Sequence, residues 1–178
     1  MILKTKRLIL RPIRLSEAPL YFENASRPEV NFAGGILPPK SVADTRKRVR
    51  KGVSAWAGRG ARPMSFSIYL KRRRVWIGGI NLRWPHGGVG EMGYAVHPDH
   101  WGKGYATEAV SRVVAVAFEK FAAHRVQATC WVKNAGSRRV LKKAGFREEG
   151  RLRGFMRIGN RIRDEFSFGI TRADFSRR

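Results

Sequence analysis

The fold is decided within residues 97–109, which read His97-Pro98-Asp99-His100-Trp101-Gly102-Lys103-Gly104-Tyr105-Ala106-Thr107-Glu108-Ala109. A predicted strand ends just before this stretch and a predicted helix begins inside it. Glycine adopts backbone angles that other residues avoid, and a helix N-terminus carries about half a positive charge. Together these features are typical of a phosphate-binding turn, although a tight strand-to-helix connection also uses glycine. The stretch lacks the Lys-Ser/Thr of a P-loop and the third glycine of a dinucleotide fingerprint.

The segment that follows has the clearest helical periodicity in the chain. Its apolar residues recur at alternating spacings of three and one, which predicts an amphipathic helix with one buried face. These positions are Ala106, Ala109, Val110, Val113, Val114, Ala117, Phe118 and Phe121.

Around this helix the sequence predicts strands and shorter helices. An opening strand is expected within residues 5–15, with Ser16 and Glu17 capping a short helix. Residues 27–40, which contain the pairs Gly34-Gly35 and Pro38-Pro39, are expected to form a loop. The remaining elements are a helix over 41–57, a meander of strands over 64–70, 75–82 and 91–96, a strand over 126–132, a helix over 137–144 stopped by Gly145, and a final hairpin around Gly159-Asn160. This order predicts a mixed sheet with helices packed on it.

Length and charge limit what the protein can be. The chain has 178 residues, which fits a single domain over residues 1–178. Lys and Arg number 37 against 13 Asp and Glu, a net charge of +24. Such a field favours anionic ligands and disfavours aminoglycosides and polyamines, although an arginine-rich composition alone would also produce it.

No segment predicts a membrane span or an oxidising compartment. The longest apolar run, Val113 to Phe118, is far shorter than the roughly 20 residues of a membrane-spanning helix. The single cysteine, Cys130, cannot form an internal disulfide and is expected to be a small core residue. No metal site is expected, because the four histidines lack ligand-like spacing. We therefore expect a cytoplasmic protein.

Several spaced motifs resemble the GNAT acetyltransferases, and most closely the RimJ/RimL branch, whose characterised members acetylate the N-terminal amine of ribosomal proteins. The resemblance extends over residues 3–172. The matching segments are Thr5 to Pro12, Gly90 to Val96, Trp101 to Ala109, the Asn134/Ser137 pair, and Gly145-Phe146. It implies an α/β fold of the acyl-CoA N-acyltransferase type, with a splayed, mixed, mostly antiparallel sheet and helices on both faces.

The resemblance also implies acetyl-CoA as cosubstrate, wedged between the strand ending at Val96 and the strand near 128–132. Unpaired backbone groups at parting strands can bind the pantetheine amides. The implied pantetheine contacts are Tyr94, Ala95 and Val96. The implied pyrophosphate contacts are Trp101, Gly102, Lys103, Gly104, Tyr105, Ala106 and Thr107. Asn134 is expected to hold pantetheine or to fix its loop, and Arg138, Arg139 and Lys142 either reach the 3′-phosphate or are simply solvated.

Three groups are candidates for the chemistry. Glu91 is either a general base for the amine, directly or through a water, or the partner of an arginine. The Val96 amide is the expected donor to the acetyl oxygen. Ser137 either protonates the leaving thiolate or caps the helix that begins there. An α-amine is easier to supply in its neutral form than a lysine amine, by about 3 kcal/mol.

Two alternatives remain open beside a protein N-terminal acetyltransferase. One is a small-molecule or antibiotic acetyltransferase. The other is a non-catalytic module that binds RNA or the ribosome through its basic surface on a GNAT scaffold, with affinity that falls steeply with salt. The sequence does not distinguish a monomer from a homodimer.

Overall fold

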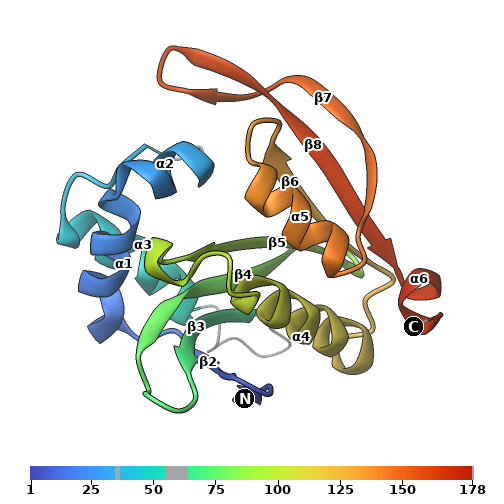
Figure 1. Ribbon diagram of the computed structural model, residues 1–178, viewed down its shortest axis with the longest axis horizontal. Coiled ribbons are helices and arrows are strands. Elements are labelled where there is room, and N and C mark those ends of the chain that lie inside the picture. Colours follow the sequence, from blue (N-terminus) through green and yellow to red (C-terminus); the bar gives the residue numbers. More distant parts are fainter. Residues whose placement is uncertain (35–36, 55–63, 178) are drawn as a thin grey trace.

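The computed structural model describes residues 1–34, 37–54 and 64–177. Within them the strands form one eight-stranded sheet with the order β1-β2-β3-β4-β5-β6-β8-β7 (Figure 1). The strands are β1 (Leu3–Lys4), β2 (Leu8–Pro12), β3 (Met64–Leu70), β4 (Trp76–His86), β5 (Val89–Val96), β6 (Arg125–Trp131), β7 (Arg147–Ile158) and β8 (Arg161–Thr171). All neighbours pair antiparallel except β5 and β6.

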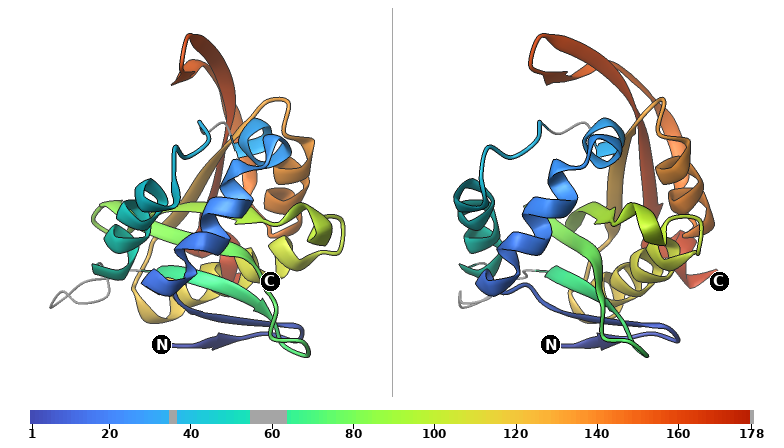
Figure 2. Two further views of the ribbon diagram at one scale, coloured as in Figure 1. Left: turned by 90° about the vertical axis from the view of Figure 1, so that its left-hand side faces the viewer. Right: turned by 60° about the vertical axis from the view of Figure 1, so that its left-hand side comes forward.

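Helices cover both faces of this sheet (Figure 2). The α-helices are α1 (Ala18–Ser26), α2 (Pro28–Gly34), α3 (Val42–Ser54), α4 (Tyr105–Lys120), α5 (Ala135–Lys143) and α6 (Arg172–Ser176), and two short 3-10 turns are η1 (Leu15–Glu17) and η2 (Pro98–His100). α4 and α5 lie on one side, and α1 and α3 on the other (Figures 1 and 2). The mixed, mostly antiparallel α/β fold expected from the sequence is confirmed.

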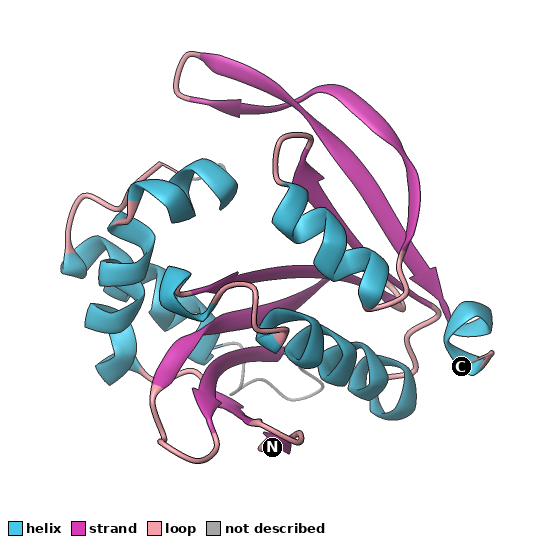
Figure 3. Ribbon diagram, viewed as in Figure 1, coloured by secondary structure: helices cyan, strands magenta, loops and turns pink. Residues whose placement is uncertain are grey.

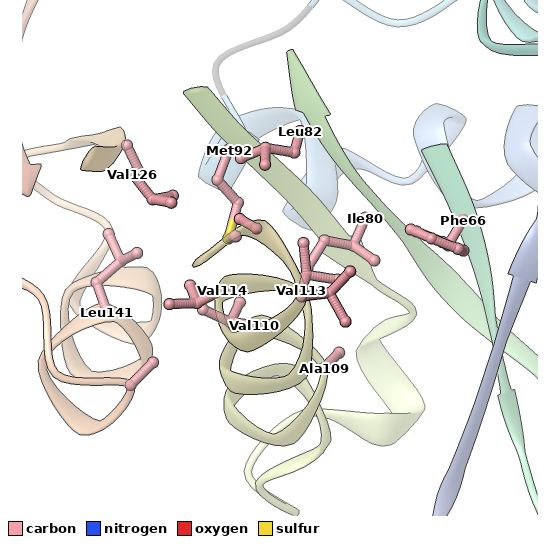
Figure 4. Close-up of a cluster of buried hydrophobic side chains, with 14 of the residues drawn as sticks. Phe66, Ile80, Leu82, Met92, Ala109, Val110, Val113, Val114, Val126 and Leu141 are labelled. Carbon is pink, nitrogen blue, oxygen red and sulfur yellow. The ribbon is translucent and has the colours of Figure 1, made fainter. Parts of the chain in front are cut away.

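The apolar stripe of α4 supplies the centre of the core. Val110, Val113 and Val114 are fully buried and meet residues of the sheet, including Ile80 and Met92 (Figure 4). Branched side chains spaced three and four apart line one helix face, which fits the pleated surface of the strands. Burial removes the stripe from water and fixes the position of the helix, so the N-terminus of α4 is held at one point beside the end of β5.

β5 and β6 part soon after they meet. They pair in parallel at only three positions, from Val89↔Arg125 to Glu91↔Gln127. Beyond Glu91, β5 continues to Val96 along β4, while β6 continues along β8. Figure 1 shows the two strands meeting at the right and diverging toward the left and top. The splay implied by the sequence resemblance is therefore present.

Two local expectations need correction (Figure 3). The segment expected as a loop over 27–40 contains α2, which begins at Pro28, a residue suited to the first turn of a helix. Its Phe32 ring contacts the Trp131 ring with centroids 4.5 Å apart, a long-range contact that local sequence does not reveal. Ser16 lies inside η1 and is not its cap. Glu17 instead accepts a hydrogen bond from the Arg14 amide at 2.7 Å.

The other elements lie close to their expected ranges. Ser41 caps α3 by accepting from the Asp44 amide at 3.1 Å, and the expected continuation of this helix to residue 57 falls outside the described residues. α6 was not expected from the sequence. It is capped by Thr171, which exchanges hydrogen bonds with Asp174.

Candidate active site

The parting of β5 and β6 leaves backbone groups of β5 without a strand partner on one edge. The His97 amide donates to the Ile77 carbonyl on β4 at 2.8 Å. Because successive peptide groups in a strand point to opposite edges, the amide of Val96 points toward the opening. The Val96 carbonyl accepts a bond from the Trp101 indole Nε1 at 2.6 Å. The edge of β5 thus offers an amide donor beside the opening, as expected for a pantetheine-binding strand.

The turn into α4 has the geometry of an anion site. Gly102 and Gly104 have φ of 73° and 78°, and Gly104 is the N-cap residue of α4. These left-handed angles disfavour any side chain. The Glu108 amide donates to the Gly104 carbonyl at 3.1 Å, and the amides that precede Glu108 in this first turn are left to bind a ligand. A diphosphate fits this cradle, whose amides and helix dipole both favour negative charge.

Residues near the N-terminus of the chain hold this turn in place. Glu108 accepts hydrogen bonds from the Thr5 hydroxyl, from the Arg7 amide at 2.8 Å and from Arg7 Nε at 2.7 Å. Arg7 also donates to the Lys103 carbonyl at 2.9 Å and lies 4.6 Å from the centre of the Tyr105 ring. Burial raises the pKa of Glu108, but these hydrogen bonds and the Arg7 charge outweigh it, and the pKa is lowered overall.

Ser137 and Tyr94 face each other across the site. Their hydroxyl oxygens are 2.8 Å apart, which joins β5 to α5. Ser137 does not cap α5, contrary to one of the two roles expected for it. The cap is Asn134, whose side chain accepts from the Ser137 amide at 2.9 Å and donates to the Ala33 carbonyl of α2 at 2.9 Å. Asn134 therefore fixes its loop, and the Ser137 hydroxyl is left for Tyr94.

Glu91 and Glu148, which flank the opening between β5 and α5, are both paired with basic residues. Arg83 Nη2 lies 2.5 Å from Glu91 Oε1 at the point where β5 and β6 part, and Glu91 is partly exposed. Glu148 contacts Arg138 at 2.8 Å and Lys142 at 3.0 Å. Two of the three basic residues considered for the 3′-phosphate thus have a carboxylate partner on β7.

A cavity of about 770 Å³ lies on the other face of the sheet, between α1, α3, β4 and β5. It reaches Tyr94 and Ala95, two of the residues expected to contact pantetheine. The described lining contains no Asp or Glu, whereas Arg48, Lys51 and Arg83 are basic. Apart from Tyr94 and Ala95, sequence reasoning missed these lining residues. They include Tyr21, Asn24, Gly79 and Asn81.

Other chemistry finds little support in the described residues. Cys130 is buried, and burial raises the pKa of its thiol to about 11, so it remains a neutral core thiol. Within residues 1–34, 37–54 and 64–177 no cluster of three or more His, Cys, Asp or Glu side chains could hold a metal ion. None of the described helices is long and apolar enough to cross a bilayer.

Comparison with known proteins agrees with this geometry. The family model of the GNAT acetyltransferase domain matches residues 7–147. The chain belongs to the GNAT acetyltransferases. An uncharacterised N-acetyltransferase of Bacillus licheniformis, p20, is 30% identical over 177 residues, which cover 98% of each chain.

Two solved structures show the same GNAT fold at low sequence identity. A spermidine N-acetyltransferase from Vibrio cholerae in complex with CoA and spermine has a TM-score of 0.83 and 18% identity, with 97% of this chain and 99% of that chain covered. A ribosomal-protein-S5-alanine acetyltransferase from Vibrio fischeri has a TM-score of 0.79 and 21% identity, with 96% of each covered. The chain is therefore a GNAT-family N-acetyltransferase, and it shares its fold with both of these proteins.

We predict that Gly104→Asp abolishes acetyl-CoA binding, because it places a carboxylate at the N-terminus of α4 on a left-handed backbone. The added Cβ would also come within 3.3 Å of Arg7 Nη2. Isothermal titration with acetyl-CoA measures the loss. The matched control is Gly159→Asp, in the β7–β8 turn, where φ is 57° and an added Cβ would have no other atom within 4 Å. Unchanged affinity in Gly104→Asp would contradict the assignment of the turn.

We also predict that Glu108 contributes to acid sensitivity. A carboxylate whose folded pKa lies below its unfolded value of about 4.3 stabilises the fold above that value and loses the contribution as pH falls through the folded pKa. Chemical denaturation from pH 7 to pH 3 should show a smaller loss of unfolding free energy in Glu108→Gln than in the parent protein. Glu119→Gln, an exposed position near the other end of α4, controls for the loss of one charge. An equal loss in both variants would refute the prediction.

Proposed function

We propose that this N-acetyltransferase transfers the acetyl group of acetyl-CoA to the N-terminal α-amine of a polypeptide, as members of the RimJ/RimL branch do. The observation that carries the proposal is that the unpaired edge of β5 and the 770 Å³ cavity meet at the same residues of β5. The edge of β5 faces the parting from β6, and Tyr94 and Ala95 also line the cavity on the other face. A cosubstrate bound along that edge would present its thioester at the end of the cavity.

The cosubstrate supplies an activated acetyl group, and the residues of the chain bind and orient it. Tyr94, Ala95 and Val96 line the pantetheine path in this proposal. The pyrophosphate lies on the turn formed by Trp101, Gly102, Lys103, Gly104, Tyr105, Ala106 and Thr107. The Val96 amide donates to the acetyl oxygen, and Ser137, whose hydroxyl meets that of Tyr94 at 2.8 Å, delivers a proton to the leaving sulfur.

The cavity favours an acceptor with few positive charges. A polyamine carries several ammonium groups that need carboxylate partners, and the described lining provides none. The α-amine of a peptide carries one charge, which is lost when the amine becomes a nucleophile. Because its pKa is lower, the free energy needed to deprotonate the α-amine at neutral pH is about 3 kcal/mol smaller than for a lysine amine.

Glu91 is the proposed proton acceptor, acting through solvent because its carboxylate is partly exposed. We predict that Glu91→Gln lowers kcat for peptide acetylation by about 10²-fold or more while the Kd for acetyl-CoA stays the same. Thiol release during turnover measures kcat. The control is Arg83→Gln, which breaks the same ion pair but keeps the carboxylate. Equal losses in both variants would show that Glu91 acts only through the ion pair.

Transfer itself is tested with labelled acetyl-CoA and a panel of ribosomal proteins, peptides and small amines, followed by mass spectrometry. Label on a polypeptide N-terminus is the expected result. Label on a small amine alone would establish the second enzymatic candidate, a small-molecule acetyltransferase. Absence of transfer to every acceptor would refute the proposal.

A basic cavity of about 670 Å³ supports contact with ribosomal RNA through the residues other than Lys103 and Tyr105, which the cosubstrate occupies in this proposal. It lies beside the turn into α4 and is lined by Lys6, Arg7, Leu70, Lys71, Arg72, Arg73, His100, Lys103 and Tyr105. Phosphate groups of RNA suit this lining, which has no acidic side chain among its described residues. A non-catalytic RNA-binding module would use the same surface without acetyl transfer.

We predict that RNA affinity decreases steeply with salt and that Arg72→Ser/Arg73→Ser flattens this dependence, because fewer counterions are released. Titration of a labelled ribosomal RNA fragment between 50 and about 200 mM salt, the range over which such contacts lose affinity, measures the slope. Arg157→Ser/Arg161→Ser, at the distant β7–β8 turn, is the charge-matched control. If Arg72→Ser/Arg73→Ser leaves the salt dependence unchanged, this surface does not bind RNA.

A further inference from the structure

Helix α1 contributes two polar side chains to the lining of the cavity between α1, α3, β4 and β5, which we call the acceptor cavity. Tyr21 and Asn24 are three residues apart, so they lie on one face of the helix about one turn from each other. Both line the cavity. Neither has a role in the cosubstrate site described above, so their polarity needs a separate explanation.

The hydrogen bonds of Tyr21 set the direction of its hydroxyl group. Glu17 is buried, and its Oε2 accepts from Ser67 Oγ at 2.7 Å. Since Ser67 has one hydroxyl proton and gives it to Glu17, the contact of 3.0 Å between Ser67 Oγ and Tyr21 Oη requires Tyr21 to donate. The phenol proton thus points toward Ser67 and the Phe66 carbonyl, which lies 3.4 Å from Oη, and the oxygen keeps a lone pair with which it can accept. Burial raises the pKa of Tyr21, so the phenol stays neutral.

Asn24 has an acceptor that the described residues do not satisfy. Its side chain is 4% exposed, and among these residues no donor reaches Oδ1. A buried acceptor without a donor is unfavourable, and such groups in native proteins usually have a partner or a function. The residue lines the cavity while Oδ1 itself is almost fully covered, so a ligand that draws the amide toward the cavity can supply the missing donor.

The phenol oxygen of Tyr21 lies close to the strand along which pantetheine is expected to bind. A Cβ built on Gly79 would come within 2.5 Å of Tyr21 Oη, so the phenol lies directly over β4 at this glycine. Gly79 pairs with Ala95 of β5. Neighbouring strands are about 4.8 Å apart, so the phenol oxygen is roughly one strand away from the pantetheine path.

We propose that Tyr21 and Asn24 form the binding site for the amino group of the acetyl acceptor, Tyr21 Oη and Asn24 Oδ1 each accepting one N–H. The inference rests on the proposed function, because it assigns the amine end of that acceptor. A neutral primary amine has two N–H donors and one lone pair. When both N–H groups bind to oxygens on α1, the lone pair points away from α1, toward the strands that carry the thioester. Glu17 and Ser67 act as positioning residues that orient the phenol.

The test uses the full-length protein saturated with CoA, which permits binding without turnover. The probes are the peptide Ala-Ala-Ala-amide and propionyl-Ala-Ala-amide, which has hydrogen in place of the amino group. Isothermal titration should show about tenfold or more tighter binding of the amine peptide, because its amine donates to two buried oxygens that the propionyl group would leave without a donor. Tyr21→Phe and Asn24→Ala should each reduce this preference severalfold.

Tyr69→Phe is the matched control. Like Ser67, Tyr69 donates a hydrogen bond to Glu17, with 2.5 Å between the oxygens, but Tyr69 does not line the cavity. Its variant should keep the preference for the amine, and thermal denaturation confirms that all three variants fold. Equal binding of the two peptides by the parent protein, or an equal loss of preference in Tyr21→Phe and Tyr69→Phe, would overturn the proposal.

The same preparations distinguish this inference from the proposed function. With acetyl-CoA in place of CoA, acetylation of Ala-Ala-Ala-amide by the parent protein tests the proposed function. If the protein prefers the amine peptide but does not acetylate it, the assignment of the amine site stands and the proposed reaction is refuted. If the protein acetylates the peptide but neither variant alters the preference for the amine, the proposed reaction stands and the role of Tyr21 and Asn24 is refuted.

Discussion

Backbone pairing between β5 and β6 stops after Glu91 and Gln127, and the whole site depends on that stop. A sheet interior normally satisfies every amide and carbonyl, so an unpaired edge inside a sheet needs another partner. Here part of the edge is satisfied by the chain itself, through Trp101 Nε1 on the Val96 carbonyl. The rest of the edge remains able to bind an extended ligand with amides of its own, which is the chemistry of pantetheine.

Acidic residues are scarce in this protein, and many of them stabilise the structure around the site. The chain has 13 Asp and Glu against 37 Lys and Arg. Glu108 fixes the turn into α4, Glu148 contacts α5, and Glu17 receives four donors beneath the acceptor cavity. A carboxylate among excess cations gains strong, directed hydrogen bonds. The positive field that remains can attract a cosubstrate carrying phosphates, while the few acids give the binding surfaces their shape.

The sequence predicted the parts of the fold that repeat a regular period. The stripe of α4, the meander of β3 to β5 and the glycines before α4 are local signals, and all three are present. α2 was not predicted because its long-range contacts come from about a hundred residues away, where Trp131 meets Phe32 and Asn134 donates to the Ala33 carbonyl. Ser137 was assigned as a possible cap because serine suits that position. Asn134 caps the helix instead, since the helix begins two residues earlier than expected.

The acceptor side of the site was less predictable for a related reason. Tyr21 and Asn24 lie in a helix whose sequence shows no motif, and each becomes notable only through residues far away in the chain. Ser67 directs the Tyr21 hydroxyl, and Gly79 leaves the space into which that hydroxyl fits. A larger residue at 79 would displace the phenol from β4. The absence of a Cβ at Gly79 therefore links the two halves of the site, because it allows α1 to approach β4 at the position that pairs with Ala95.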